Sequence, residues 1–148
     1  GTIRLPPDFS EFLKLLNSKK VKYLLVGGWA VGYYGYPRAT NDMDLWVEID
    51  SENADKIIEV LREFGFAQSS LNRELFLQKD QIIRMGVPPL RIEILTTISG
   101  LQFADAYAEK STAQFEDVSV NIISLRKLKV NKKAAGRFKD LDDLENLP

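Results

Sequence analysis

Two aspartates carry the most suggestive chemistry in this sequence. Asp42 and Asp44 are two residues apart in the otherwise apolar stretch 42–47, and residues two apart on a β-strand share a face. Both carboxylates therefore point the same way, while Met43 and its apolar companions point into a core. Neighbouring carboxylates repel each other unless a cation lies between them. The simplest such cation is a divalent metal ion; a solvated strand face is the alternative.

A pair of glycines stands one helix earlier. Gly27 and Gly28 directly follow the stretch 21–26, which is apolar and β-prone except for Lys22. A chain that leaves a strand and enters a helix here turns sharply, and the first N–H groups of the helix lack partners within it. Those groups and the helix dipole favour an anion such as phosphate, although a simple turn is the alternative. Together, the glycine turn and the aspartate pair indicate metal-assisted chemistry on a nucleoside triphosphate.

These motifs resemble the signature of the polymerase-β-like nucleotidyltransferase superfamily. Its small bacterial members have Gly-Gly-x-Ala before the helix and Arg-x-Thr-x-Asp-x-Asp after it, which residues 27–30 and 38–44 match. The tail 132–143, which contains Lys-Lys-Ala-Ala-Gly-Arg-Phe-Lys-Asp, is similar to that of the subgroup with the abortive-infection (type IV) toxins. The resemblance spans about residues 8–147.

The resemblance implies transfer of a nucleoside monophosphate from an NTP to an acceptor hydroxyl, with release of pyrophosphate. It implies that Asp42 and Asp44 hold two Mg²⁺ ions, or Mn²⁺, and that Glu93 takes the place of the third carboxylate, where aspartate is commoner. Glu93 lies in the stretch 90–95, and an acid on an apolar strand is rare unless it is paired or bound to metal. Lys132 is implied to neutralise charge on the triphosphate or the acceptor.

A second group of residues is implied to bind the nucleotide. Gly27, Gly28 and Arg38 would cradle its phosphates, and Thr40 belongs to the same set at the entry to the carboxylate strand. From the residues alone, Arg38 can equally be an ordinary surface arginine. The tyrosines at 33, 34 and 36 can stack on a base or simply pack against the sheet.

The composition restricts the chemistry further. The 148 residues include no cysteine and no histidine, and 45% are hydrophobic, so we expect a single domain over residues 1–148. Imidazole bases and zinc sites built from histidine or cysteine are excluded, and a metal held by oxygen ligands is Mg²⁺ or Mn²⁺. The sequence contains no apolar run of about 18 residues and no signal-peptide pattern. We therefore expect a cytoplasmic protein without membrane contact.

Charge is unevenly distributed, although the net charge is −1. Residues 41–63 carry eight acids and two bases, whereas residues 126–139 carry seven bases and no acid. The basic block can be a solvated helix face, or it can bind polyphosphate opposite the acidic strand. In the second interpretation Lys132 binds an anion and is not needed for folding.

The expected fold is α/β (α+β in some schemes), a mixed, twisted β-sheet with helices packed against it. Strands are predicted at 21–26, 42–49 and 90–95, with hairpins at 74–85 and 113–123. Helices are predicted at 8–18, with an Asp8–Glu11 capping box, at 28–34, from a Ser51 cap to Gly65, and from Gly100 to about Lys110. Ser124 is predicted to cap a basic helix, and a final helix is predicted to pack through Phe138, Leu141, Leu144 and Leu147.

Two other functions remain open from the sequence. The chain can be a non-catalytic nucleotide- or RNA-binding module, or a subunit that depends on a partner protein or antitoxin. The acceptor is equally open: an RNA 3′ end, a protein hydroxyl, or an aminoglycoside- or lincosamide-like small molecule.

Overall fold

In the residues that the computed structural model describes (4–37, 40–66, 71–86 and 90–148), six strands form one mixed sheet. The strand order is β3-β4-β2-β1-β6-β5. The strands are β1 (Tyr23–Val26), β2 (Asp42–Val47), β3 (Ile82–Met85), β4 (Arg91–Leu95), β5 (Ser111–Phe115) and β6 (Val118–Ile122). Strand β2 pairs antiparallel with β1 and parallel with β4. The aspartate pair is therefore carried by an inner strand.

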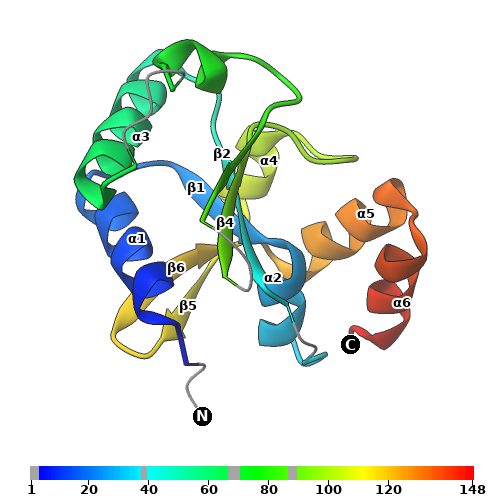
Figure 1. The fold of residues 1–148 in the computed structure, drawn as a ribbon. Coiled ribbons are helices and arrows are strands. Elements are labelled where there is room, and N and C mark those ends of the chain that lie inside the picture. Colours follow the sequence, from blue (N-terminus) through cyan, green and yellow to red (C-terminus); the bar gives the residue numbers. More distant parts are fainter. Residues whose placement is uncertain (1–3, 38–39, 67–70, 87–89) are drawn as a thin grey trace.

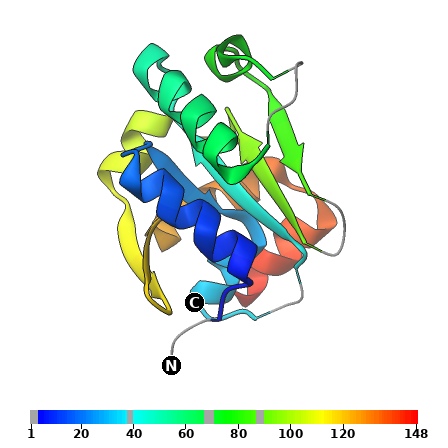
Figure 2. The same cartoon turned by 60° about the vertical axis from the view of Figure 1, so that its left-hand side comes forward.

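Helices cover both faces of this sheet. Figures 1 and 2 show α1 and α3 on one face, with α5 and α6 on the other side. The helices are α1 (Pro7–Ser18), α2 (Gly27–Tyr33), α3 (Ser51–Phe64), the 3₁₀ helix η1 (Arg73–Leu77), α4 (Phe103–Ala108), α5 (Leu125–Ala135) and α6 (Phe138–Asn146). The predicted mixed α+β fold is confirmed. None of the helices in the described ranges is long and apolar enough to cross a membrane.

Alternation along β2 separates the core from the polar face. Met43 and Leu45 are fully buried and lie beside Ile92 and Ile94 of β4, in the same core as the apolar faces of α1 and α3. Residues of opposite parity face the other side. There Trp46 is covered by Phe103 of α4, with 5.1 Å between the ring centroids. The two aspartates are on this second face, which α4 leaves open at their end of the strand.

Two helix starts differ from the sequence prediction. Helix α1 begins at Pro7 with Pro6 as its N-cap and no side-chain cap, so the Asp8–Glu11 capping box is wrong. A proline at the first helical position sets the backbone for a helix without needing a cap, and it leaves Asp8 inside the first turn. Helix α3 is capped by the side chain of Asp50, which accepts from the Asn53 N–H, instead of by Ser51.

The predicted hairpin over 74–85 is half wrong. Its second half is strand β3, but residues 73–77 form the 3₁₀ helix η1, which Asn72 caps by accepting from the Glu74 N–H. Only Phe76 of this segment is buried. Strand β3 instead pairs antiparallel with β4. By contrast, the hairpin β5–β6 and the cap of α5 by Ser124 are confirmed.

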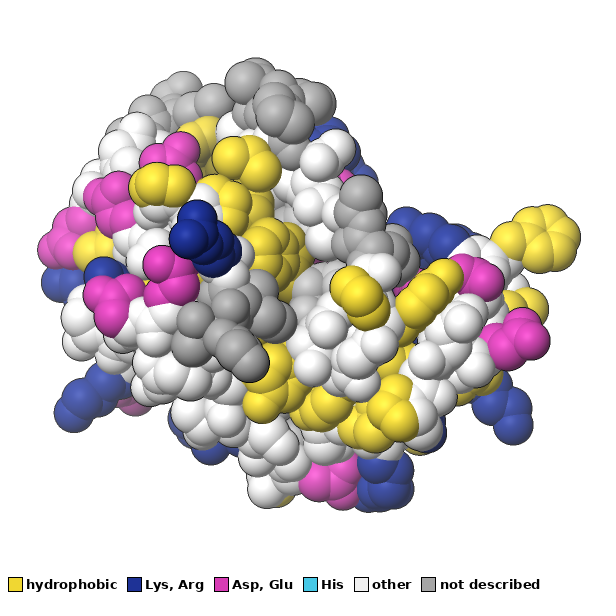
Figure 3. Space-filling view, turned by 90° about the horizontal axis from the view of Figure 1, so that it is seen from below, with side chains coloured by type: hydrophobic (Ala, Val, Ile, Leu, Met, Phe, Trp, Pro, Cys, Tyr) yellow, Lys and Arg dark blue, Asp and Glu magenta, His cyan; other side chains and the backbone are white. Residues whose placement is uncertain are grey.

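The apolar face predicted for the last helix is wrong for Phe138 and Leu141, whereas Leu147, just after the helix, is buried as predicted. Phe138 is 95% exposed and Leu141 is 46% exposed, whereas Asp140 and Asp143 are almost fully buried. Figure 3 shows apolar side chains gathered on the lower side of the molecule, where Figure 1 places α2 and α6. Within α6, the fully buried side chains are therefore the two aspartates, and Leu147 adds an apolar contact with the core just after the helix.

The three tyrosines near α2 pack against the fold. The Tyr34 hydroxyl donates to the Ile123 carbonyl at 2.7 Å, and the Tyr36 hydroxyl donates to the Asp142 carboxylate at 2.8 Å. The Tyr33 ring lies 5.9 Å from that of Phe115. These contacts favour the packing interpretation over base stacking.

Candidate active site

A polar cleft of about 770 Å³ lies over the open end of β2. Five segments line it: the β1–α2 turn, β2, the β3–β4 pair, the loop after β4, and the junction of α5 with α6. Every described residue of the predicted site lies in this lining: Gly27, Gly28, Thr40, Asp42, Asp44, Glu93 and Lys132. Arg38 lies outside the described residues. Segments distant in sequence therefore converge on one hollow.

The glycine turn packs directly onto the aspartate strand. Gly27 has φ +69°, and a Cβ there would lie 2.2 Å from Oδ2 of Asp44. A Cβ at Gly28 would lie 3.0 Å from Thr40. The Thr40 hydroxyl in turn donates to the Asp42 carbonyl at 3.2 Å. The glycines thus allow a close approach of the turn to the carboxylates that a side chain would prevent.

Gly27→Ala is expected to destabilise the protein by at least about 2 kcal/mol. The alanine would have to keep the left-handed backbone conformation of Gly27, and its Cβ would clash with Asp44. Gly32→Ala is a matched control on the same helix, where a Cβ meets nothing within 4 Å. That change should be neutral or slightly stabilising. Denaturant unfolding of both variants measures the difference, and equal stabilities would contradict the close approach.

Strand register brings the third carboxylate to the pair. Asp44 lies opposite Glu93 on the parallel neighbour β4, and Asp42 lies opposite Arg91. Arg91 donates to both Asp42 oxygens, from Nε at 3.0 Å and from Nη2 at 3.2 Å. Arg84 of β3 donates from Nε to Glu93 at 3.0 Å. Two arginines therefore supply part of the cationic charge that the sequence alone assigned to a metal ion.

Asp44 is the carboxyl group without such an arginine. Burial, with the nearby charges of Glu93 and Asp42, raises the pKa of Asp44 to about 7. Its Oδ1 atom is buried and has no hydrogen-bond partner among the described residues. A buried carboxylate oxygen without a hydrogen-bond partner favours either protonation of the carboxylate or a bound cation.

The donor set suits a hard divalent ion. Asp42, Asp44 and Glu93 offer only oxygen atoms, which Mg²⁺ and Mn²⁺ prefer, and the unpartnered Oδ1 of Asp44 is free to accept one. As arranged, however, no three acidic side chains among the described residues form a ready metal site. Asp42 and Glu93 are engaged by Arg91 and Arg84, so a metal ion must compete with these two guanidinium groups.

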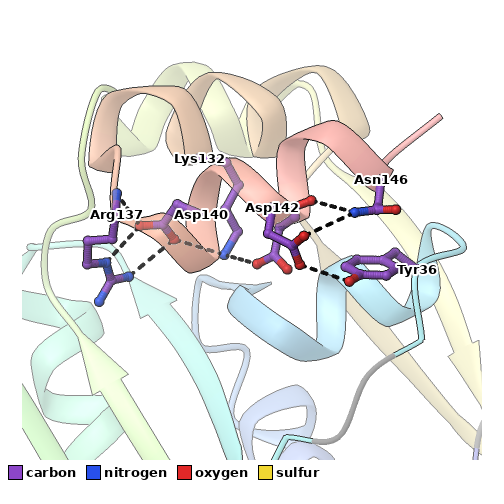
Figure 4. A network of polar contacts seen from close by, with 7 residues as sticks. Tyr36, Lys132, Arg137, Asp140, Asp142 and Asn146 are labelled. Atoms are coloured by element: carbon purple, nitrogen blue, oxygen red, sulfur yellow. Dashed lines mark hydrogen bonds and ion pairs between the residues drawn. The ribbon is translucent and has the colours of Figure 1, made fainter.

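Lys132 has a different environment from the one predicted. Its side chain is 5% exposed, and its Nζ lies 3.3 Å from Asp140 and 3.0 Å from Asp143 of α6. The sequence assigned Lys132 to anion binding and not to folding, and it predicted neither this burial nor the two aspartate partners. Figure 4 shows the lysine reaching from α5 to Asp140 of α6. It lines the cleft but neutralises buried acids of its own chain.

Four further cations line the cleft: Arg84, Arg91, Arg137 and Lys139. The first two follow from the pairing of β3 with β4 and of β4 with β2, which a single sequence does not reveal. Arg137 and Lys139 belong to the tail motif that the sequence analysis had linked to Lys132. Their position immediately after Gly136, a residue suited to ending a helix, is the sequence signal for them.

The family of the chain, together with its fold, gives the class of protein, a nucleotidyltransferase. A sequence profile of the aminoglycoside-2″-adenylyltransferase family matches residues 8–147, and the chain belongs to that family. Nucleotidyltransferase activity is thereby supported, while the abortive-infection toxin type is not shown. No curated protein matches the sequence.

Solved structures share the fold at low sequence identity. A protein from Thermotoga maritima described as a nucleotidyltransferase has a TM-score of 0.62 and 17% identity over 97% of this chain and 94% of its own. A lincosamide antibiotic adenylyltransferase bound to lincomycin has a TM-score of 0.56 and 16% identity over 98% and 97%. An antigenic nucleotidyltransferase-like protein from Paracoccidioides brasiliensis has a TM-score of 0.56 and 18% identity over 92% and 71%.

Proposed function

We propose that this protein transfers a nucleoside monophosphate, AMP in the first instance, from an NTP to a hydroxyl group of an acceptor. The observation that carries the proposal is the convergence of Asp42, Asp44 and Glu93 with the Gly27-Gly28 turn in one cleft. A volume of about 770 Å³ is within the range of small-molecule sites. The family supports adenylyl transfer.

In this proposal each residue of the cleft has a defined role. Asp42, Asp44 and Glu93 hold two Mg²⁺ ions, which when bound supply positive charge to the reacting phosphate. Glu93, whose side chain is only 14% exposed, also accepts the proton of the acceptor hydroxyl. Positioning and electrostatic stabilisation supply most of the rate, as in phosphoryl transfer generally.

The remaining residues bind and orient. The Gly27-Gly28 turn and Arg38 contact the triphosphate, and Thr40 supports the turn from the strand side. Lys132, which the tail motif marked as catalytic, is reassigned: through Asp140 and Asp143 it holds α6 against the cleft.

The charges that line the cleft restrict the charge of the acceptor. The family and the lincosamide enzyme suggest an antibiotic, and an aminoglycoside is a polycation that requires carboxylate partners. Of the acids that line the cleft, three are assigned to the metal ions, and the fourth, Asp140, is engaged by Lys132 and Arg137. Among the described lining residues, none therefore remains for a polycation. We infer that the acceptor is uncharged or anionic.

Transfer of labelled nucleotide tests the function. The protein is incubated with Mg²⁺ and ATP labelled at the α-phosphate, together with an aminoglycoside, a lincosamide, or tRNA. We expect α-label, and not γ-label, to enter one acceptor with release of pyrophosphate, and Asp42→Asn to abolish it. Nucleotide binding without transfer to any acceptor would instead favour the non-catalytic module, and transfer only after addition of cell extract would favour a partner-dependent subunit.

Competition between arginine and metal gives a separate prediction. Arg91→Met should tighten Mn²⁺ binding to the nucleotide-free protein about two- to fivefold, because the metal ion no longer competes with the guanidinium group for Asp42 and an ion pair open to solvent is weak. Arg62→Met, on the exposed side of α3, is the control and should have no effect. Titration followed by Mn²⁺ electron paramagnetic resonance measures both. Weaker binding in the Arg91 variant would show that the arginine supports the metal site.

A further inference from the structure

Arg137 occupies a fixed position at the mouth of the cleft. Helix α5 ends at Gly136, whose φ of +66° reverses the chain, and Arg137 is the N-cap residue of α6. Its guanidinium group lines the cleft, and its side chain is 65% exposed. The hydrogen bond to Asp140 is the main cause of the raised pKa of Arg137, and the charge of Asp44 contributes as well. The arginine therefore faces the same space as the catalytic carboxylates.

The carboxylate of Asp140 accepts hydrogen bonds from both the backbone and the side chain of Arg137. The Arg137 N–H and Nε donate to Oδ2 of Asp140 at 3.2 and 2.7 Å, and Nη2 donates to Oδ1 at 3.3 Å. A guanidinium group has five N–H donors, of which these contacts use two. The others point away from Asp140 and are available to a ligand in the cleft. Figure 4 shows the arginine projecting from the helix junction with Asp140 beside it.

Asp140 is itself held in place by Lys132 of α5. It is 1% exposed, and Lys132, bonded to it at 3.3 Å, also pairs with the buried Asp143. Burial alone would raise the pKa of Asp140, but Arg137 and Lys132 outweigh this and lower it. Burying three charged groups is costly unless they are well paired. The cluster therefore keeps Asp140 ionised and holds it in one place, and Arg137 with it.

A second cation stands on the same turn. Lys139 lines the cleft, and its charge acts on Asp44, partly opposing the rise in the pKa of that group. It forms no hydrogen bond or ion pair within the part of the chain that the structure describes. The first turn of α6 thus presents a rigid arginine and an uncommitted lysine towards carboxylates that would otherwise repel a polyphosphate.

We propose that Arg137 binds the β- and γ-phosphates of the nucleotide, and that Asp140, held by Lys132, positions it. This inference rests on the proposed function. A planar guanidinium group that is already oriented loses little freedom when it forms a bidentate contact with phosphate. The alternative is that Arg137 and Asp140 form only a structural ion pair at the helix junction.

Calorimetric titration of the full chain with Mg-ATP, AMP and inorganic tripolyphosphate tests this. Arg137→Ala should weaken ATP and tripolyphosphate binding about tenfold or more, while AMP, which lacks both phosphates, loses less than about twofold. Arg137→Lys should recover only part of the loss. Lys133→Ala removes an exposed cation of α5 outside the cleft lining and should change nothing.

The Asp140→Asn variant tests whether Arg137 needs to be positioned by Asp140 or acts through its charge alone. It keeps Arg137 but weakens its clamp, so ATP affinity should fall towards that of Arg137→Ala; a melting curve shows whether the variant is folded, and if it is not, the Arg137 variants decide. Equal ATP affinity in wild type and Arg137→Ala, or an equal loss for ATP and AMP, would overturn the inference alone. A wild-type protein that binds neither ATP nor tripolyphosphate would overturn the proposed function and the inference with it.

Discussion

Asp44→Asn is expected to abolish nucleotidyl transfer and, in the absence of metal, to raise the melting temperature at pH 8. The catalytic loss follows from the removal of a proposed metal ligand. The gain in stability follows because ionised Asp44 is largely desolvated beside Glu93, and its buried Oδ1 has no hydrogen-bond partner among the described residues. The introduced amide keeps the shape, carries no charge and can donate a hydrogen bond to Glu93.

The pH dependence of this gain has a definite sign. The pKa of Asp44 rises from 3.8 to about 7 on folding, so between these values the folded protein keeps a proton that the unfolded chain has lost. The free energy of unfolding therefore falls as pH rises from about 4 to 7. At about 1.4 kcal/mol per pKa unit, part of it shared with Glu93, removal of the charge should stabilise by about 2–4 kcal/mol at pH 8 and by little at pH 4.

Melting curves of metal-free wild type and variant at pH 4 and pH 8 check this, with an expected rise of roughly 5–10 °C at pH 8. Asp42→Asn is the matched control, because Asp42 has its counter-charge in Arg91 and its removal should not stabilise. If Asp44→Asn lowers the melting temperature at pH 8, the aspartate has a structural role and the site assignment is wrong.

Lys132→Ala is expected to be strongly destabilising, by about 3–5 kcal/mol, because it leaves Asp140 and Asp143 buried without their shared cation. Both aspartates are about 1% exposed. This reverses the expectation from the sequence, in which Lys132 had a part in anion binding and none in folding.

Urea unfolding of Lys132→Ala beside Lys133→Ala measures this effect. Lys133 is the next residue but exposed, and its removal should change the free energy of unfolding by less than about 0.5 kcal/mol. Similar losses in the two variants would show that the buried cluster contributes nothing to the docking of α6.

The part of the site that the sequence predicts is local. Alternation along 42–47 places Asp42 and Asp44 on one face, and the positive φ of Gly27 agrees with a turn that only glycine readily forms. The arginine partners are not local. They depend on a register that sets Asp42 opposite Arg91 and on the choice of β4 as the partner of β3, and neither is encoded in any short segment.

The last helix shows why periodicity can mislead. Phe138 and Leu141 have helical spacing with other apolar residues, and that pattern normally marks a buried face. Here the buried positions are Asp140 and Asp143, because Lys132 from the preceding helix offers them a counter-charge. A hydrophobic pattern carries no information about such a partner, so neither the burial of Asp140 and Asp143 nor their contact with Lys132 was predicted.

The most direct test of the central claim is a calorimetric titration of ATP into wild type, Asp42→Asn and Asp44→Asn, each with Mg²⁺ and with EDTA. We expect wild type to bind ATP tightly only with Mg²⁺. Each variant should lose most of that metal-dependent affinity while remaining folded. Wild-type binding that is the same in EDTA, or unchanged affinity in both variants, would contradict a metal-dependent nucleotide site at this aspartate pair.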